Sequence, residues 1–329
     1  MRLPDFSDIE AAAARLAGLA VRTPVIESRR LNEIAGGRIL IKAECLQRTG
    51  SFKFRGAWNC ISQLDAKAAK GGVVTYSSGN HAQGVAAAAQ LKGLTALIVM
   101  PADTPAIKMA NTRRYGAEIV TYDRASESRE EIAARIAAER GAVIVPPFEH
   151  RDVIAGQGTV GLEFAQQAAE MGANLDDVLV PASGGGLTAG VALALEAKSP
   201  ATRAHTVEPE GFEDHLLSLK SGRRERNARM SGSICDALLS PMPGEMTFAI
   251  NRPRLGAGVV VSDAEACRAV RFAFAELKLV VEPGGAVALA AVLTGKIETR
   301  DRTIGVIASG GNVDAALYAG IIAAATSGE

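Results

Sequence analysis

The chain has 329 residues, of which 48% are hydrophobic and 22% charged, and its 36 basic side chains are matched by 36 acidic ones. This length allows one large or two ordinary α/β domains with a sizeable buried core. A formal charge of zero provides no basic excess for nucleic acid or an anionic membrane, so we expect a small-molecule partner. Apolar runs such as residues 95–100 are far shorter than the ~20 residues of a membrane-spanning helix, which predicts a soluble protein.

The N-terminal segment and the cysteines both favour a cytoplasmic location. Residues 1–20 carry acidic side chains in a helical pattern, whereas a secretory signal has a basic start followed by a continuous apolar run. The cysteines are scattered and form neither a disulfide framework nor a zinc-binding spacing, so we interpret them as core residues of a protein in a reducing compartment. They are Cys45, Cys60, Cys235 and Cys267.

Short β-rich runs alternate along the chain with alanine-rich helical patterns. The predicted strands are residues 38–44, 71–77, 95–101, 117–123, 141–147, 176–182, 204–210 and 303–309. The clearest helical patterns are residues 28–35, 80–93 and 128–141, and each of them ends at or next to glycine. Such alternation is typical of right-handed βαβ units, so the predicted fold class is α/β with parallel sheets flanked by helices.

Three predicted strands end in a Ser-Gly turn that opens a helix. These turns lie in residues 75–84, 180–190 and 306–314. The carboxyl ends of parallel strands line the ligand crevice of an open sheet, so the three turns are expected to converge on one ligand.

The second of these turns predicts a phosphate site. Consecutive glycines after Ser183 leave backbone N–H groups free, and a helix starting near Leu187 adds the positive end of its dipole. The glycines are Gly184, Gly185 and Gly186, and neither P-loop nor dinucleotide-binding spacing is present. The alternative is a turn that only lets a helix pack closely on a strand.

The other two turns offer polar groups with two interpretations each. Ser77, Ser78, Asn80 and His81 together suit a substrate carboxylate, although either serine could simply cap the helix and the histidine could be structural. Ser309 could donate to a ring nitrogen, or it could cap a helix that starts near residue 312.

Lys53 lies between two phenylalanines in a chain that is only 4% aromatic. An apolar setting disfavours the ammonium form, so the amine becomes available as a nucleophile toward an aldehyde. Pyridoxal phosphate would satisfy both this lysine and the phosphate site. An exposed lysine at a helix start is the alternative.

Six motifs in this order and at these separations resemble the serine/threonine dehydratase and serine racemase family of fold type II pyridoxal-phosphate enzymes. The motifs are SFKFRGA (51–57), SSGNHAQG (77–84), GQGT (156–159), SGGGL (183–187), VEPEG (207–211) and ASGGNVD (308–314). The resemblance extends from residue 22 onward.

The resemblance implies a role for each cofactor-binding position. Lys53 would hold the cofactor covalently, with Phe52 near its ring. Asn80 would contact the phenolic oxygen and Ser309 the pyridine nitrogen. The phosphate would be bound by Ser183, Gly184, Gly185, Gly186 and Leu187. Ser183 departs from the family pattern, because many relatives have a glycine there.

The implied reaction is elimination of water from L-threonine, L-serine or a related 3-hydroxy amino acid, giving a 2-oxo acid and ammonia. Lys53 would act as the base at Cα, and Ser78 would exchange a proton on the opposite face. Serine racemisation and 3-hydroxyaspartate elimination are the alternatives on the same scaffold, and a non-catalytic binding protein is the alternative from another class.

The resemblance also implies a divalent cation site, for Mg²⁺, Mn²⁺ or Ca²⁺. In the racemases and some dehydratases of this family a Glu and an Asp six residues apart bind the ion together with a carbonyl between them. Here Glu208, Asp214 and the Phe212 carbonyl have that spacing, and oxygen ligands suit these ions. A charged surface loop is the alternative.

The expected architecture has two domains and resembles the tryptophan synthase β-subunit. Residues 46–145 would form a small α/β domain, and residues 1–45 and 146–329 a large domain that binds pyridoxal phosphate. No regulatory domain is expected after the catalytic one, and a homodimer is expected. One departure is Asp236-Ala237, where relatives have Asp-Gly.

Overall fold

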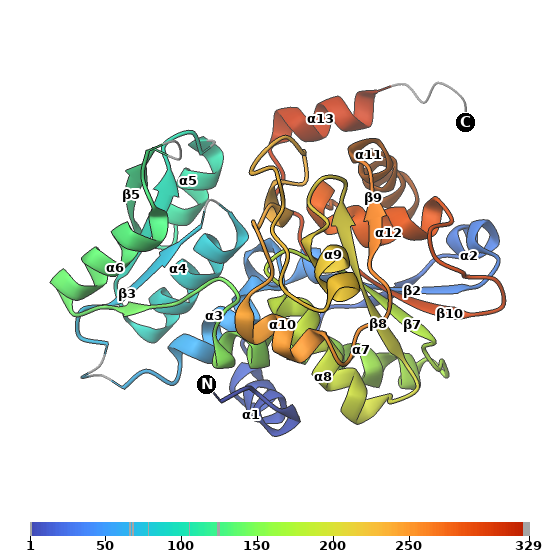
Figure 1. Ribbon diagram of the computed structural model, residues 1–329, viewed down its shortest axis with the longest axis horizontal. Coiled ribbons are helices and arrows are strands. Elements are labelled where there is room, and N and C mark those ends of the chain that lie inside the picture. The colour runs from blue at the N-terminus through green and yellow to red at the C-terminus, as the bar shows by residue number, and fades with distance from the viewer. Residues whose placement is uncertain are drawn as a thin grey trace.

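The computed structural model describes residues 2–324 apart from 66, 68, 78, 105, 124 and 125, and it gives only the backbone of 106 and 107. The described strands form two sheets, one with the order β1-β2-β10-β7-β8-β9 and one with the order β5-β4-β3-β6 (Figure 1). All pairs are parallel except β1 with β2, which is an antiparallel pair at the edge of the larger sheet.

The strands and helices have the following bounds. The strands are β1 (Val25–Glu27), β2 (Arg38–Lys42), β3 (Val73–Tyr76), β4 (Ala96–Pro101), β5 (Glu118–Tyr122), β6 (Val143–Ile144), β7 (Asp177–Pro181), β8 (Arg203–Pro209), β9 (Val259–Val261) and β10 (Thr303–Ile307). The α-helices are α1 (Phe6–Leu16), α2 (Arg29–Ala35), α3 (Lys53–Ile61), α4 (Asn80–Lys92), α5 (Ala106–Arg113), α6 (Arg129–Arg140), α7 (Arg151–Glu170), α8 (Gly186–Lys198), α9 (Asp214–Ser221), α10 (Glu245–Asn251), α11 (Asp263–Phe272), α12 (Pro283–Leu293) and α13 (Ala315–Ala323). Short 3₁₀ turns are η1 (Glu44–Leu46), η2 (Arg48–Gly50) and η3 (Asp236–Leu238), and η4 (Ala273–Leu277) is a π-helical turn.

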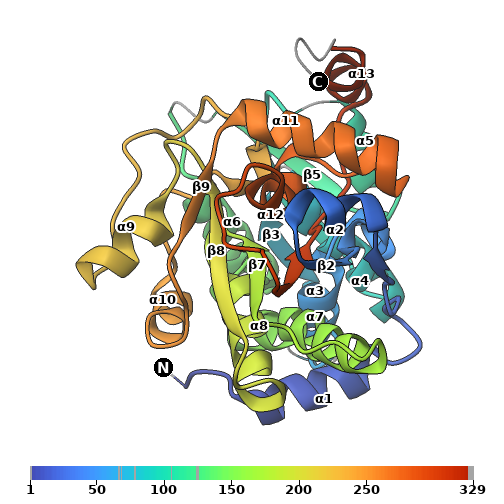
Figure 2. The same ribbon diagram turned by 90° about the vertical axis from the view of Figure 1, so that its right-hand side faces the viewer.

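Helices cover both faces of the larger sheet. Figures 1 and 2 show α7 and α8 on one face and α11 and α12 on the other. Val178 and Val180 of β7 face the first pair of helices, whereas Leu179 points into the core formed with α11 and α12. This alternation along one strand is what a parallel sheet buried on both sides requires.

The smaller sheet has the same construction with different helices. α3 and α4 pack on one face, and α6 packs on the other. The local sequence explains the limits of α6, because Ser128 caps its first turn and Gly141 ends it in the left-handed conformation with φ 65°.

Glycines allow α3 to lie close to two other helices. A Cβ at Gly56 would lie 2.7 Å from the Val153 carbonyl oxygen of α7, and a Cβ at Gly156 of α7 would lie 2.5 Å from the Arg55 carbonyl oxygen. On the α4 side, a Cβ at Gly84 would lie 3.1 Å from the Lys53 carbonyl carbon. These close approaches fix the position of α3, whose first residue is Lys53.

The predicted α/β class and the predicted strands are confirmed, with three differences. β1 and β9 are only three residues long and were not predicted, and residues 141–147 contribute only the two-residue strand β6. Strands this short lack the alternation that reveals a strand in a sequence. The division into domains at residues 46 and 145 stays a prediction. Over the described residues, no helix combines the length and apolar character needed to cross a membrane.

Candidate active site

The start of α3 is fixed onto the turn that follows β10. The Phe52 N–H donates to the Ser309 carbonyl at 3.2 Å, and Ser51 forms an isolated antiparallel bridge with Gly310. Phe52 and Ser309 are both buried. The predicted functional segments around Lys53 and Ser309 therefore lie side by side.

The Lys53 amine has no anionic partner among the described residues. Its Nζ donates to the Pro147 carbonyl at 2.8 Å and lies 5.2 Å from the centre of the Phe52 ring. Burial lowers the pKa of this amine to about 8, because the ammonium form is poorly solvated. A larger fraction is therefore neutral near pH 7 than for an exposed lysine, as a nucleophile or a general base requires.

Pro147, whose carbonyl accepts a hydrogen bond from Lys53, is followed by Phe148, which packs against the glycine loop after β7. A Cβ at Gly184 would lie 2.3 Å from the ring of Phe148, and a Cβ at Gly186 would lie 2.9 Å from the Phe148 Cβ. Residues 147 and 148 thus connect the lysine with the predicted phosphate loop. The absence of side chains at the two glycines is what allows this packing.

The glycine loop keeps its carbonyl groups bonded and its N–H groups available. The Gly184 carbonyl accepts from Thr247 Oγ1 at 2.6 Å, and the Gly185 carbonyl accepts from Asn251 Nδ2 at 3.3 Å. Among the described residues, no acceptor contacts the N–H groups of residues 184–187, which lead into the first turn of α8. Gly185 has φ 90°, a conformation that favours glycine. This geometry fits an anion at a helix N-terminus.

Ser183 does not contribute its hydroxyl to that N–H cluster. Its Oγ donates to Ser240 Oγ at 2.8 Å, and its carbonyl accepts from His215 Nε2 at 2.7 Å. The hydroxyl that a glycine at this position would lack therefore ties the loop to Ser240, whereas the contact with His215 is made by the backbone.

The side chain of Ser77, in the turn after β3, does not cap α4. The N-cap residue of α4 is Gly79, which has no side chain, and its N–H donates to Ser77 Oγ at 3.3 Å. The capping interpretation of Ser77 is therefore wrong, because its hydroxyl binds a group outside the helix. Ser78 lies outside the described residues.

Asn80 is held by two neighbours. Its Nδ2 donates to Glu282 Oε1 at 2.6 Å, and its Oδ1 accepts from Asn312 Nδ2 at 2.7 Å. Burial raises the pKa of Glu282 to about 7. The sequence analysis missed this carboxyl group, because Glu282 directly precedes a proline at N1 of α12, a pattern that by itself indicates only the start of a helix.

His81 is a buried neutral imidazole near Lys53. Its Nε2 donates to the Val145 carbonyl at 3.0 Å, and its Nδ1 has no partner among the described residues. Burial and, to a smaller extent, the charge of Lys53 lower the pKa of His81 to about 3. The ring therefore presents a free acceptor nitrogen.

Ser309 does not cap the helix that follows it. α13 starts at Ala315, and Asp314 Oδ1 accepts from the N–H groups of Ala316 and Leu317. The capping interpretation of Ser309 is wrong, since residues 310–313 separate it from the true cap. Its contact with a cofactor ring stays a prediction.

The predicted metal ligands are buried near one another. Glu208 accepts from the N–H groups of His215 and Leu216, and Asp214 Oδ1 accepts from Asn227 Nδ2 at 2.7 Å. Asp214 Oδ2 has no partner among the described residues. Burial raises the pKa of Asp214 to about 7, and burial followed by the charge of Asp214 raises the pKa of Glu208.

These two carboxylates fit a hard cation. Asp214 Oδ2 is a buried acceptor that lacks a hydrogen-bond partner among the described residues, and a bound cation would compensate its burial. The described residues contain no cluster of three or more His, Cys, Asp or Glu side chains with metal-binding geometry. The predicted ligand set has only two such side chains and the Phe212 carbonyl, so it stays a prediction.

A second buried cluster of charges lies two residues after Lys53. Arg55 pairs with Glu44 at 2.8 Å and with Glu163 at 2.7 Å, and Lys42 pairs with Glu163 at 2.7 Å. Arg55 and Lys42 are fully buried. The cluster links α3 to β2, η1 and α7.

An ion pair connects α5, beside the smaller sheet, with η3, which lies on the side of the larger sheet. Lys108 of α5, which packs with the smaller sheet, contacts Asp236 of η3. The Lys108 side chain is only 12% exposed, and both charges act on Glu282. Lys108 is therefore a cation that is paired with Asp236 and whose charge acts on Glu282, the partner of Asn80.

Comparison with known proteins assigns the family. The profile described as "Pyridoxal-phosphate dependent enzyme" matches residues 16–310. The chain belongs to this enzyme family. The expected cofactor, pyridoxal phosphate, is confirmed with it. The site fits that cofactor through the available N–H groups of residues 184–187 and through the Lys53 amine, which has no anionic partner among the described residues.

Several relatives of this pyridoxal-phosphate enzyme cover nearly the whole chain. It is 44% identical to the L-threo-3-hydroxyaspartate ammonia-lyase of Pseudomonas sp, covering 98% of this chain and 99% of that one. It is 41% identical to the protein of the same name from Saccharomyces cerevisiae, covering 100% of this chain and 99% of that one. It is also 41% identical to a serine racemase of Oryza sativa, covering 94% of this chain and 91% of that one.

Solved structures agree on the fold. The structure of maize serine racemase matches with a TM-score of 0.91 at 39% identity, covering 96% of each chain. The crystal structure of a T.th. threonine deaminase matches with a TM-score of 0.89 at 44% identity, covering 94% of this chain and 99% of that one. The fold type II architecture is therefore confirmed, and the ammonia-lyases among the relatives agree with the predicted lyase class.

Proposed function

We propose that the protein is an ammonia-lyase that eliminates water from a 3-hydroxy amino acid and releases a 2-oxo acid and ammonia. The observation that carries this proposal is the Lys53 amine, which is partly buried, has no anionic partner among the described residues and has a pKa of about 8. When bound, pyridoxal phosphate withdraws electrons from the substrate Cα. A neutral amine beside it can take the Cα proton, and loss of the β-hydroxide follows.

The residues around Lys53 would hold the cofactor and orient the substrate. The N–H groups of residues 184–187 would bind the phosphate, and Asn80 would donate from Nδ2 to the phenolic oxygen. Ser309 would contact the pyridine nitrogen. The substrate α-carboxylate would bind near Ser77 at the start of α4, where the helix dipole favours an anion. His81 would not donate to this carboxylate, because its free nitrogen is an acceptor.

L-threo-3-hydroxyaspartate is the substrate that we favour. Two relatives that cover nearly the whole chain carry that activity in their names. The additional carboxylate of this substrate needs a cationic partner. Lys108 is the candidate, because its charge acts on Glu282, which accepts from Asn80, and it would exchange its ion pair with Asp236 for the substrate. L-Serine and L-threonine, the substrates expected by default, become the second candidates.

Racemisation is the alternative reaction. Relatives named serine racemase match over 94% of the chain, and the role proposed for Ser78 is to exchange a proton on the face of the substrate opposite Lys53. Elimination and racemisation both start with loss of the Cα proton, so Lys53 would serve both.

A product assay tests the reaction and the substrate together. The protein supplied with pyridoxal phosphate is incubated with L-threo-3-hydroxyaspartate, L-serine or L-threonine, with the erythro diastereomer as the matched control. Both 2-oxo acid and the D-amino acid are followed over the same time course. We expect 2-oxo acid to form fastest from the threo-hydroxyaspartate. D-Serine accumulating well ahead of pyruvate would replace the lyase proposal with the racemase.

We also propose that Glu208, Asp214 and the Phe212 carbonyl bind a divalent cation. An ion bound only by the folded state raises the melting temperature as its concentration increases. We expect Mg²⁺, Mn²⁺ or Ca²⁺ to raise the melting temperature of the wild type but not of Asp214→Asn. Glu245→Gln, at an exposed carboxylate of α10, is the control. Equal shifts in all three proteins would show that the ion binds elsewhere.

A further inference from the structure

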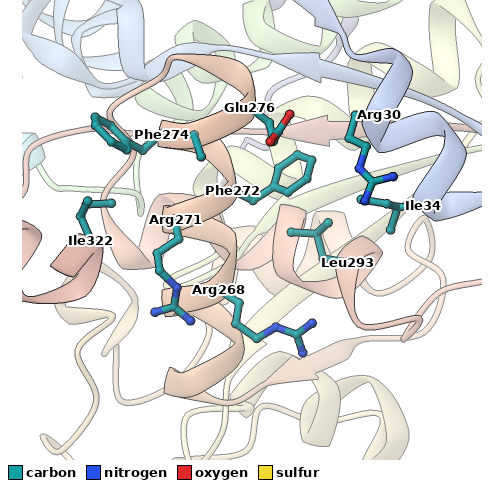
Figure 3. A pocket seen from close by; sticks show the side chains of 10 residues that line it. Arg30, Ile34, Arg268, Arg271, Phe272, Phe274, Glu276, Leu293 and Ile322 are labelled. Atoms are coloured by element: carbon teal, nitrogen blue, oxygen red, sulfur yellow. The ribbon is translucent and has the colours of Figure 1, made fainter. Parts of the chain in front are cut away.

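Polar side chains outside the lysine site differ in whether solvent can reach them. Arg30 and Arg268 are exposed and line a hollow of about 590 Å³ between α2 and α11 (Figure 3). Asp214 at the start of α9, in contrast, is fully buried, and its Oδ2 has no hydrogen-bond partner among the described residues. An exposed arginine is hydrated, whereas a buried acceptor without a partner needs a bound group. The contacts of Asp214 therefore decide what a group bound there would affect.

A chain of hydrogen bonds leads from Asp214 to Ser183 in the glycine loop. Asp214 Oδ1 accepts from Asn227 Nδ2 at 2.7 Å, and the same amide group donates to the Ser240 carbonyl at 2.9 Å. Ser183 Oγ donates to Ser240 Oγ at 2.8 Å and accepts from the Ser240 N–H at 3.3 Å. Asn227 is buried, and its own N–H donates to the Pro241 carbonyl at 2.8 Å. This chain joins a side chain proposed to bind a cation with a loop proposed to bind phosphate.

A second connection leads from Glu208 to the same residue of the loop. Glu208 Oε1 accepts from the His215 N–H at 2.7 Å, and His215 Nε2 donates to the Ser183 carbonyl at 2.7 Å. Glu208 and His215 are fully buried. A Cβ at Gly185 would lie 2.6 Å from His215 Cε1, so the ring also packs against the glycine loop. Both carboxylates of the proposed cation site thus reach Ser183, one through its hydroxyl and the other through its carbonyl.

We infer that Ser183 couples the proposed cation site to the phosphate-binding loop, so that a cation and the cofactor phosphate strengthen each other's binding. The inference rests on the cation site proposed above. A cation on Asp214 Oδ2 would hold that carboxylate, and with it the Asn227 amide, in one position. Ser240 and Ser183 then keep their contact. The N–H groups of residues 184–187 are already ordered when phosphate arrives, and a preorganised loop binds more tightly.

The hydroxyl of Ser183 distinguishes coupling from simple support of the loop. A glycine at this position would keep the carbonyl that accepts from His215 but would lose both contacts with Ser240. If the hydroxyl only supported the loop, its loss would weaken phosphate binding by the same factor with and without a cation. If it couples the two sites, its loss reduces the effect of the cation on phosphate binding. Ser183→Gly, which introduces the residue that many relatives have, separates the two roles.

Calorimetric titration of the cofactor-free full chain with pyridoxal phosphate tests the coupling. The Kd is measured with a chelator and with saturating Mg²⁺, Mn²⁺ or Ca²⁺. For the wild type we expect at least one of these ions to lower the Kd about tenfold, and pyridoxal phosphate to lower the Kd of that ion by the same factor, because coupling between two sites is reciprocal. In Ser183→Gly the factor should fall to about threefold or less, since one of the two connections is lost.

Two further variants are the controls. Ser240→Ala removes the hydroxyl that accepts from Ser183 without giving the glycine loop more backbone freedom, and it should reduce the factor as Ser183→Gly does. Ser199→Gly, at the other end of α8, removes a similar contact between hydroxyls, with Thr202 at 2.7 Å, and should leave the factor unchanged. Circular dichroism confirms that each variant is folded.

The outcomes separate this inference from the proposed cation site. If an ion binds to the wild type but not to Asp214→Asn, and the Kd of pyridoxal phosphate does not change, the cation site stands and the coupling is overturned. A factor that persists in full in Ser183→Gly and Ser240→Ala would overturn the role of Ser183. Failure of all three ions to bind would contradict the cation site and the coupling together.

Discussion

Lys53 and Arg55 lie two residues apart on α3 but in opposite electrostatic settings. Burial disfavours the charge of Arg55, but its partners Glu44 and Glu163 outweigh burial and raise the pKa of the guanidinium. Among the described residues Lys53 has no anionic partner and donates to a backbone carbonyl, and burial lowers its pKa to about 8. A buried cation with all its partners present stabilises a fold, whereas one without an anion keeps its chemistry available.

The largest expected effect comes from the unpaired cation. Lys53→Ala should lower turnover by about 1000-fold or more, because the group that takes the Cα proton is lost. The free energy of unfolding should change much less than turnover, since the change leaves no buried charge without its partner. Steady-state 2-oxo acid formation and denaturant unfolding measure the two effects. Wild-type turnover in the variant would contradict the role of Lys53.

The paired cation should behave in the opposite way. Arg55→Met should lower the free energy of unfolding by about 3–5 kcal/mol, because it leaves Glu44 and Glu163 buried without their partner. The fluorescence of Trp58, the single tryptophan of the chain and a residue of α3, reports the unfolding. Arg38→Met is the control, since its ion pair with Glu27 is partly exposed and worth about 1 kcal/mol or less.

Glu282 should make stability depend on pH. Its pKa is raised to about 7 in the folded protein from 4.5, so the folded state binds more protons between these values and the free energy of unfolding falls as pH rises from 4.5 to 7. The full loss is at most about 3 kcal/mol at 1.36 kcal/mol per pKa unit.

Glu282→Gln isolates this effect, because an amide stays neutral. The charges that act on Glu282 are those of Asp236 and Lys108. We expect the difference in stability between pH 5 and pH 7 to be smaller in the variant than in the wild type. An unchanged difference would show that Glu282 does not titrate in this range.

The smallest expected effect concerns substrate choice. Lys108→Met should lower kcat/KM for L-threo-3-hydroxyaspartate about tenfold relative to L-serine, because only the first substrate has a second carboxylate. Lys108→Arg, which keeps the charge, is the matched variant and should retain most of the selectivity. A wild type without hydroxyaspartate activity would contradict the proposed substrate, whereas equal losses on both substrates would contradict only the role of Lys108.

Much of this site was accessible from the sequence, because glycine-rich turns after apolar runs have few possible structures. The contacts among residues distant in sequence could not be predicted from the sequence. Nothing in the sequence near Pro147 indicates that its carbonyl meets Lys53, or that Phe148 fills the space beside Gly184. Serines next to helices invite a capping interpretation, and for Ser77 and Ser309 it was wrong. Only the path of the chain decides which local bond a hydroxyl makes.

The buried cysteines allow local unfolding of each core to be measured by thiol labelling. Cys60 lies in the core of α3 and α4 beside the smaller sheet, whereas Cys45 and Cys235 lie in the core beside the larger one. Burial raises the pKa of all three thiols to about 12, so hardly any thiolate exists in the native state at neutral pH. Alkylation of these thiols must therefore wait for the surrounding core to open, and the order in which they are labelled tells which of the two sheets loosens first.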